Sequence, residues 1–486
     1  MVQSLRGITL LLTIFGAIAL LATAPAPRSD WRPVVSGRLA NGVRYAILPR
    51  RGSEPGVALL MRNEGGFIAE RRPGERGLAH LIEHLVFHSP TKTAPDDPHH
   101  FLRIGLPLTF SAPTAGTTSW RESNYFVSTK TTAPRDLDTL LRLFREVAAE
   151  LTFRADIVDD QRADVIREMA WRKPGNDTYA RYIAAVAPGS PTDVIDAQNS
   201  DDVPTAPVAT IRALYHRLYQ PQKMMVVVVG AVDAVRTRAL IAKRFGGWRR
   251  SAQANQRPPY PTFDEARIKP ITVAALPEGR RSVMMTVVMP SPPVPASRRA
   301  QADAAILDML AIRAVGDRLA QGQAGKAGVW IEQGDQGHRL IILWDDPAHD
   351  RWTQAVANLR STTCDLRLNG FSAVEWDAAR RNVLDELTQR AQSMPSVPNV
   401  ELAKDLSRAL ADGRVLIPPD ELLQRARILL PATNRASGSH WWRSQWTAAR
   451  EHLRVEAPEL ATSPDPVMAV RAAADRAADS RCALRR

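Results

Sequence analysis

The chain has 486 residues, of which 44% are hydrophobic and 24% charged, and its formal net charge at pH 7 is +13. This composition excludes a mostly disordered or fibrous chain, and the length favours two or three domains over a single hydrophobic core. The 64 Lys and Arg residues are spread along the whole chain instead of forming one basic run with interleaved aromatic residues, so no nucleic-acid-binding surface is predicted.

The N-terminus has the features of an export signal. Arg6 precedes an apolar run over residues 8–22, and small residues follow it. This pattern predicts a signal peptide over residues 1–26 and a location in the periplasm or cell envelope. Prolines follow both possible Ala-x-Ala cleavage sites, so a second interpretation stays open, in which residues 8–24 remain as an inner-membrane anchor.

The first half of the chain mixes strand and helix patterns. In chain order, the apolar periodicity predicts strands over 42–48 and 56–61, a helix over 78–88, a strand over 123–128, helices over 137–151, 157–172 and 207–219, a strand over 223–230 and a helix over 233–245. Asp233 is a suitable N-cap for the last helix. Because strands and helices do not alternate strictly, we expect an α+β fold.

The second half partly repeats this order after a Pro-rich boundary at residues 251–262. Its predicted elements are a strand over 282–289, a helix over 297–319, strands over 329–331 and 340–344, and helices over 352–366 and 373–392. We therefore expect two α+β domains related by duplication, over 34–250 and 262–460, each a mixed or antiparallel sheet covered by helices. Residues 461–486 are predicted to form a weakly ordered helix or tail.

The most informative motif is His80-Leu81-Ile82-Glu83-His84, within the helix predicted over 78–88. Positions i, i+3 and i+4 of a helix share one face, so His80, Glu83 and His84 converge on one point. Two imidazoles one turn apart supply two of the three protein ligands of a catalytic zinc site, and a carboxylate beside them can accept a proton from water acidified by the metal. The motif therefore predicts His80 and His84 as zinc ligands and Glu83 as the catalytic base.

The motif is rarer than chance allows, and the residues between its polar positions are apolar. About 0.02 matches to a His-x-x-acid-His pattern are expected by chance in a chain of this composition. Leu81, Ile82 and Leu85 would bury the remaining faces of the helix. The competing interpretation, a helix with a solvated polar stripe, is the weaker one.

Other polar or aromatic clusters are less informative. His88 continues the stripe of the motif and is expected beside the site or on the surface. His99 and His100 are expected to be solvated, and the Gly-rich segment 322–328 to be a loop, because it lacks the spacing and the hydroxyl residue of a phosphate-binding loop. The aromatic run 440–446 is expected to pack in the core, with a partner surface as the alternative.

The chain has only two cysteines, Cys364 and Cys482. They are too few for a disulfide scaffold or for a zinc site made of thiolates. In an oxidising compartment they could pair and tie the C-terminus to the second half, but two unpaired thiols are an equal alternative.

Four stretches resemble the pitrilysin and insulinase family of inverted zinc metallopeptidases, above all its half-length members, such as the subunits of mitochondrial processing peptidase and their bacterial relatives. The stretches are 65–70, 77–87, 162–169 and 219–230. The resemblance implies that Glu168 is the third zinc ligand, on a second helix. It also implies that a half-length unit faces a second unit, as a homodimer or heterodimer, and encloses a peptide or unfolded protein segment lying along an edge strand.

Two positions depart from the pattern of this family. Gln161 stands where the family usually has a second glutamate, seven residues before the ligand. Changes around metal ligands typically cost 10-fold to 100-fold in metal affinity or activity. Ala115 and Gly116 precede Thr117 where the edge strand usually carries Asn-Ala, so a substrate hydrogen bond from asparagine is missing.

Two functions from different classes therefore remain. The first is a zinc-dependent endopeptidase that hydrolyses unfolded peptides or protein segments, and the intact His80, Glu83, His84 and Glu168 favour it. The second is a catalytically weak or inactive binding or scaffold subunit of a peptidase heterodimer, which Gln161 and Ala115 keep open.

Overall fold

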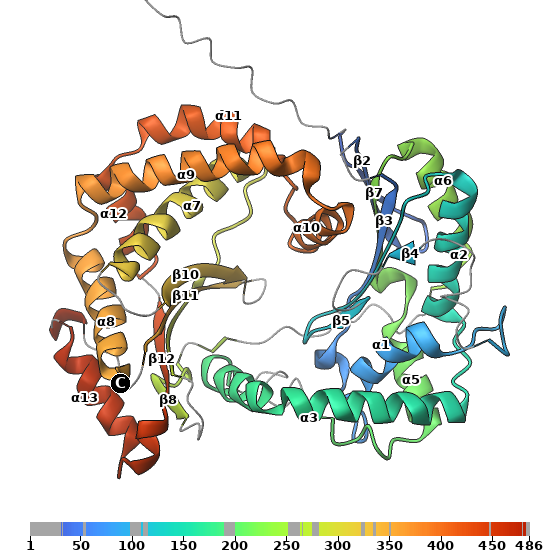
Figure 1. Cartoon of the computed structure of the whole chain (residues 1–486), viewed down its shortest axis with the longest axis horizontal. Helices are drawn as coiled ribbons and strands as arrows, with labels where there is room; N and C mark the ends of the chain where they lie inside the picture. The colour runs from blue at the N-terminus through green and yellow to red at the C-terminus, as the bar shows by residue number, and fades with distance from the viewer. Residues whose placement is uncertain are drawn as a thin grey trace, which may run out of the picture.

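The chain folds into two sheet-and-helix halves that lie side by side (Figure 1). In the computed structural model the α+β prediction is confirmed: each half has one sheet with helices packed on it. The described residues are 31, 33–51, 55–97, 108–109, 115–188, 200–250, 263–264, 266–274, 281–321, 326–333, 337–348, 351–446, 449–478 and 480–482; for 108–109, 173–180, 333 and 480 only the backbone is described.

The first sheet has the strand order β1-β2-β7-β3-β6-β4, with β5 also paired to β6. Among the described strands of this sheet, only β2 and β7 are parallel neighbours; the other pairs are antiparallel. The central strands are apolar on both faces, which predicts helices on both sides. The strands are β1 Val35–Arg38, β2 Arg44–Pro49, β3 Val57–Asn63, β4 Leu108–Thr109, β5 Gly116–Thr118, β6 Ser123–Thr129 and β7 Met224–Gly230.

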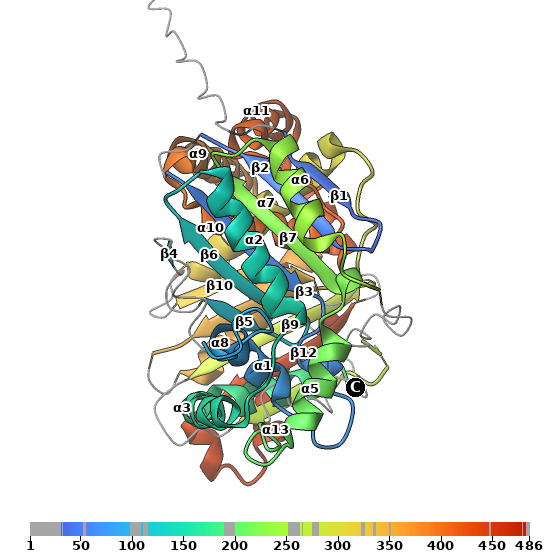
Figure 2. The same ribbon diagram turned by 90° about the vertical axis from the view of Figure 1, so that its right-hand side faces the viewer.

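The helices of the first half cover one face of this sheet and one end of it. In Figure 2, α2 and α6 lie across the strands, and α1 and α5 lie near the end of the sheet, beside α3. Asp233 caps α6, as predicted, because its side chain accepts a hydrogen bond from the backbone N–H of Arg236. These helices are α1 Leu78–His88, α2 Pro134–Ala149, α3 Ala155–Val186, α5 Val208–Leu218 and α6 Ala234–Phe245.

The second sheet has the order β10-β11-β9-β12-β8, with β12 and β8 parallel and the other pairs antiparallel. The pairing repeats that of the first half: β2, β3, β5, β6 and β7 have the same chain order and the same pairing directions as β8, β9, β10, β11 and β12. This repeat supports the predicted duplication. The strands are β8 Ile271–Ala274, β9 Ser282–Pro290, β10 Lys326–Gln333, β11 His338–Asp346 and β12 Arg450–Glu456.

The helices of the second half follow the same plan as those of the first half. Three of them were not predicted from the sequence. The long helix α7 takes the place in chain order that α1 has in the first half, but it carries no His-x-x-Glu-His motif. Trp442 and Trp446 are buried, so core packing of the aromatic run is confirmed for these two rings. The helices are α7 Arg298–Ala320, α8 Trp352–Leu368, α9 Ala373–Ser393, α10 Asn399–Ala411, α11 Pro419–Leu429, α12 Arg435–Ser444 and α13 Pro466–Arg476.

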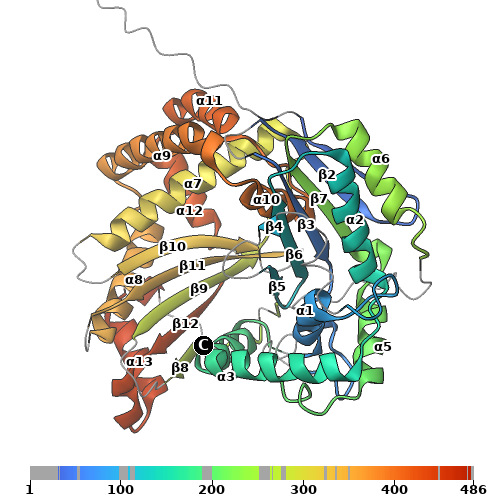
Figure 3. The same cartoon turned by 45° about the vertical axis from the view of Figure 1, so that its right-hand side comes forward.

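Two elements pack on the sheet of the opposite half. Leu402, Ala403 and Leu406 of α10 pack on the face of the first sheet that lies opposite α2 and α6. The C-terminal end of α3 packs on the second sheet, where Tyr182 and Val186 share a buried apolar cluster with its strands. Figure 3 shows α3 running from α1 to that sheet.

Residues 466–476 were expected to be a weakly ordered helix or tail, and the structure has a helix that is packed in the core. They form α13, whose Val470, Ala473 and Ala474 are buried in the core of the second half. Like α6, this helix comes directly after the last strand of its sheet in the chain. It contacts α8, just as α6 contacts α2 in the first half. The alternation of Ala with charged residues made the segment look like a solvated tail, although small residues allow a helix to pack closely.

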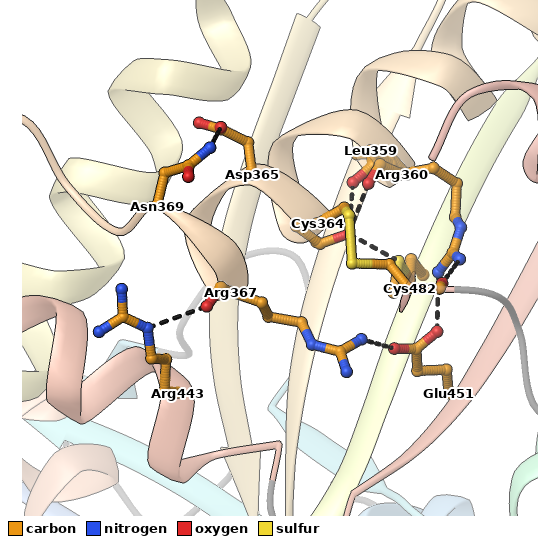
Figure 4. The surroundings of a disulfide bond; sticks show 11 residues. Leu359, Arg360, Cys364, Asp365, Arg367, Asn369, Arg443, Glu451 and Cys482 are labelled. Atoms are coloured by element: carbon orange, nitrogen blue, oxygen red, sulfur yellow. Dashed lines mark hydrogen bonds and ion pairs between the residues drawn. A yellow bond between two sulfur atoms is a disulfide. The ribbon is translucent and has the colours of Figure 1, made fainter. Parts of the chain in front are cut away.

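The two cysteines form a disulfide between Cys364 of α8 and Cys482 near the C-terminus (Figure 4). The alternative of two unpaired thiols is therefore wrong. Arg360, one turn before Cys364, donates to the backbone carbonyl of Cys482 and to Glu451 of β12 (2.7 Å). The C-terminal segment is thus fastened to α8 by a covalent bond and by a buried arginine.

Several predictions concern residues outside the described part. These are the export signal, the alternative anchor over 8–24, the domain boundary at 251–262, and His99 and His100. Of the segment 322–328, the described residues 326–328 belong to β10. Among the helices of the described part, none combines the length and the apolar character needed to span a membrane.

Candidate metal centre

The helix α1 is held firmly in the first half. Leu81, Ile82 and Leu85 are fully buried, as the sequence predicted. At its N-terminus the carboxylate of Glu70 accepts hydrogen bonds from the backbone N–H groups of Gly77 (2.9 Å) and Ala79 (2.6 Å). A carboxylate in this position satisfies free N–H groups and complements the helix dipole.

The structure brings His80, His84 and Glu168 together. Nε2 of His84 lies 3.3 Å from Oε2 of Glu168, and Nε2 of His80 lies 3.7 Å from the same oxygen. In the described part of the chain these three side chains make the one group able to hold a metal ion, with candidate ligand atoms within 4.8 Å of one another. His88 is not in that group.

The electrostatic conditions of the two histidines differ. Burial, and then the neighbouring His84, lower the pKa of His80 to about 4, so its imidazole is neutral near pH 7. Burial disfavours a charge on His84 too, but its hydrogen bond to Glu168, together with Glu83 and Gln161, raises its pKa. The same hydrogen bond holds the pKa of Glu168 far below its usual value. Without a metal ion, the carboxylate of Glu168 therefore favours the protonated form of His84.

Glu83 lies beside this group and against the edge strand β5. Its Oε2 is 3.8 Å from Nε2 of His80 and accepts a hydrogen bond from Oγ1 of Thr118 (3.3 Å). A Cβ atom placed on Gly116 would lie 2.3 Å from Oε1 of Glu83, so only glycine leaves room for this position of the carboxylate. Burial raises the pKa of Glu83 to about 7.

Two residues on α3 touch the group from outside. Arg172 donates to Oε1 of Glu168 (2.5 Å), which leaves Oε2 toward the histidines. Gln161 is buried, and a hydrogen bond between its side chain and His84 contributes to the raised pKa of that ring, but its amide carries no charge. Gln161 therefore does not reproduce the carboxylate expected at this position.

Sequence reasoning did not identify Thr118 or Arg172 as neighbours of the site. Arg172 follows Glu168 by one helical turn, so helical spacing could have indicated it once Glu168 was chosen. Thr118 offered no such local signal, because its contact with Glu83 joins a strand and a helix 35 residues apart.

Comparison with known families gives two adjacent matches. Residues 65–177 match the family described as "Insulinase (Peptidase family M16)", and residues 206–383 match "Peptidase M16 inactive domain". Together they cover more than half of the chain. The first match contains all four predicted site residues.

Named relatives are zinc proteases. The "Probable zinc protease PqqL" of Escherichia coli is 30% identical over 244 residues, which cover 49% of this chain and 26% of that protein. The "Zinc protease PQQL-like" of Arabidopsis thaliana is 22% identical over 88% of this chain and 42% of that protein. The chain thus spans between about a quarter and a half of the length of these curated relatives.

Solved structures show the same fold. The first half of the periplasmic protease PqqL from Escherichia coli superimposes with a TM-score of 0.73 at 21% sequence identity, over 94% of this chain and 99% of that chain. A structure described as "Predicted insulinase family protease from Yersinia pestis" gives a TM-score of 0.69 at 19% identity, over 94% of this chain and 99% of that chain. These likenesses establish the duplicated two-domain architecture.

Proposed function

Because the chain belongs to the insulinase family of peptidases, M16, we propose that it is a zinc-dependent endopeptidase acting on unfolded peptides or protein segments. The observation that carries the proposal is the convergence of His80, Glu83 and His84 from α1 with Glu168 from α3. The zinc protease names of the relatives support the same reaction class.

The three proposed ligands, His80, His84 and Glu168, fit a zinc ion. Two imidazole nitrogens and one carboxylate oxygen form a common catalytic zinc set, with a fourth position left for water or substrate. Ligand atoms about 2.0 to 2.1 Å from a tetrahedral ion lie about 3.4 Å from one another. The separations of 3.3 and 3.7 Å from Oε2 of Glu168 to the two Nε2 atoms agree with that spacing.

Glu83 would act as the general base. Zinc in such a site supplies a Lewis acid that polarises the peptide carbonyl and acidifies the attacking water. Glu83 would take the proton from that water and hold it on its carboxylate until the leaving nitrogen accepts it. Its raised pKa, about 7, suits a group that both accepts and releases a proton near neutral pH.

The substrate would lie on β5 by strand addition. Among the described strands β5 pairs with β6 alone, so its other edge is available for an extended peptide. The Cα of Gly116 faces the carboxylate of Glu83 and the side chain of Thr118 donates to it, which would place a peptide on this edge close to the base. Since Ala115 replaces the asparagine expected there, substrate binding would rely on backbone hydrogen bonds.

The chain would work with a second unit. It superimposes on almost all of the first half of a longer protease, so a homodimer or a heterodimer with another half-length subunit would enclose the substrate. The PqqL structure is described as periplasmic, and the disulfide is typical of oxidising compartments. We place this protein in the periplasm or cell envelope as well.

The test combines metal analysis with cleavage of a fluorogenic, unstructured peptide by the full chain. We expect about one zinc per chain, and Glu83→Gln should keep the zinc while kcat falls by at least about 10³-fold. His84→Gln should lose the zinc, whereas His88→Gln, on the same helix face one turn later, is the control and should keep both. Absence of zinc from wild type, or cleavage that survives Glu83→Gln, would refute the assignment.

The alternative, a binding or scaffold subunit, makes a different prediction. It is favoured by Gln161, whose buried and uncharged amide cannot supply a negative charge beside His84. A scaffold subunit would bind peptide, with or without zinc, and show no cleavage in wild type even when mixed with its partner subunit.

A further inference from the structure

A row of hydroxyl groups extends from Glu83 into the core of the first half. Oγ1 of Thr118 donates to Oε2 of Glu83 (3.3 Å) and lies 3.2 Å from Oγ of Ser123, its neighbour across β5 and β6. The Ser123 hydroxyl in turn hydrogen-bonds with the phenol of Tyr219, and the phenol of Tyr219 hydrogen-bonds with that of Tyr125. Ser123, Tyr219 and Tyr125 are buried.

The direction of these hydrogen bonds follows from counting protons. Each hydroxyl has one proton to donate, and an ionised carboxylate can only accept. When Glu83 is a carboxylate, Thr118 uses its proton on Glu83 and must accept from Ser123. By the same count Ser123 accepts from Tyr219, and Tyr219 accepts from Tyr125. All the donors then point toward Glu83, and hydrogen bonds aligned in one direction strengthen one another in a buried environment.

We infer that Thr118, supported by the hydroxyls of Ser123, Tyr219 and Tyr125, is a positioning residue that holds the carboxylate of Glu83 against β5. The inference rests on the proposed function, in which Glu83 is the base and β5 receives the substrate. Thr118 belongs to the strand on which the peptide would lie, so the strand that aligns the peptide bond also aligns the base. Binding geometry and proton transfer are then set by one element.

The tyrosines provide a matched pair of variants. Tyr215 and Tyr219 are both buried and their rings stack at 4.8 Å, but the hydroxyl of Tyr215 donates to the carbonyl of Val147 (2.8 Å) and is not in the row. Tyr219→Phe removes a hydroxyl from the row, and Tyr215→Phe removes one beside it. Any general loss of packing or stability should affect both variants.

The experiment measures kcat, KM and zinc affinity of the full chain, the latter by competition of the apo protein with a chromophoric chelator. Thr118→Val, which keeps the shape of the side chain, should lower kcat about 10-fold with KM and zinc affinity unchanged within about 2-fold. Thr118→Ser should restore kcat to within about 3-fold of wild type. Tyr219→Phe should lower kcat about 3-fold, and Tyr215→Phe should leave it unchanged.

The outcomes separate this inference from the proposed function. If Glu83→Gln abolishes cleavage but Thr118→Val leaves kcat unchanged, the positioning role is overturned and the peptidase assignment stands. If Thr118→Ser fails to restore kcat, the hydroxyl is not the active feature and the inference is equally overturned. Equal effects of Tyr219→Phe and Tyr215→Phe on kcat would overturn the supporting role of the hydroxyls beyond Ser123, those of Tyr219 and Tyr125. A zinc-loaded wild type without cleavage would overturn both proposals.

Discussion

At the scale of single residues, His452 of β12 is a titratable group buried in the second half. Its Nδ1 donates to the carbonyl of Lys269 (2.6 Å), and its Nε2 accepts from the hydroxyl of Thr272 (3.1 Å). Burial, with the cations Arg454 and Lys269 nearby, lowers the pKa of His452 to about 4. The ring is therefore a neutral structural group between the strands and the end of α3.

This environment predicts acid sensitivity. The unfolded chain has a histidine pKa near 6.5, so between pH 6.5 and 4 it binds a proton at residue 452 that the folded chain does not. The free energy of unfolding should fall with decreasing pH in that window, by up to about 3 kcal/mol from this residue. Urea denaturation from pH 7 to 4.5 should show a shallower decline for His452→Asn than for wild type. His440→Asn, at an exposed position, is the control, and parallel curves for all three proteins would contradict the prediction.

The residues of the site differ in how far the sequence could reveal them. His80, Glu83 and His84 lie within one helical turn and a third, so their convergence follows from helix geometry alone. Glu168 lies on another helix, and only the family resemblance identified it. The contacts of Thr118 and Tyr219 depend on how β5, β6 and the segment after α5 pack together. Local periodicity carries no information on such contacts.

At the scale of elements, β5 is short but touches the site twice. Glycine at position 116 leaves the space that Oε1 of Glu83 occupies, and its backbone is not in the left-handed region. Alanine there is compatible with the strand but not with the present position of the carboxylate. The departure from Asn-Ala at 115 and 116 therefore changes more than a substrate hydrogen bond, because it also sets where the base lies.

Gly116→Ala should consequently displace Glu83 without unfolding the strand. Misplacement of a catalytic group by about 1 Å can cost about 100-fold, so we expect kcat to fall between about 10-fold and 100-fold. Zinc affinity should stay within about 2-fold, because the atoms nearest the new methyl group all belong to Glu83 and not to the proposed ligands. Gly247→Ala is the control, since nothing lies within 4 Å of a Cβ atom at that position. Normal kcat for Gly116→Ala would show that Glu83 does not need this position.

The elements that the sequence missed share a physical reason. The strand β12 carries His, Arg and Glu among its apolar residues, and these polar side chains are buried through contacts with α3 and neighbouring strands. Likewise α10 was not predicted, although its Leu402 and Leu406 are buried, because it packs on the other half's sheet and not beside its sequence neighbours. Such elements gain their stability from tertiary contacts.

At the scale of the whole molecule, the disulfide closes a loop of 118 residues that includes α9 to α13 and β12. Removing a cross-link of this length should cost about 2 to 5 kcal/mol, chiefly by enlarging the conformational freedom of the unfolded chain. The Cys364→Ser, Cys482→Ser double variant should unfold at a lower urea concentration than wild type, and reductant should lower the midpoint of wild type alone. Zinc content should not change, because the proposed site lies in the other half. An unchanged midpoint would contradict the prediction.

The architecture of each half was largely predictable from the sequence, but the packing between the two halves was not. The order of most strands and helices followed from apolar periodicity, although β8, β12 and α10 were missed, and the partial repeat of that order indicated the duplication. The packing of α10 on the first sheet and of α3 on the second sheet could not be predicted, because each helix contacts a sheet that is distant in the sequence.

The helix α3 makes the two halves mechanically dependent. It is 32 residues long, about 48 Å at 1.5 Å per residue, and it carries Glu168 beside α1 and Tyr182 on the second sheet, where the phenol meets Thr286 (3.0 Å). Tilting the second sheet would move the C-terminal end of α3 and thereby displace Glu168 from His80 and His84. Linkage is reciprocal. If the tilt weakens metal binding by a given free energy, a metal ion bound to Glu168 disfavours the tilt by the same free energy.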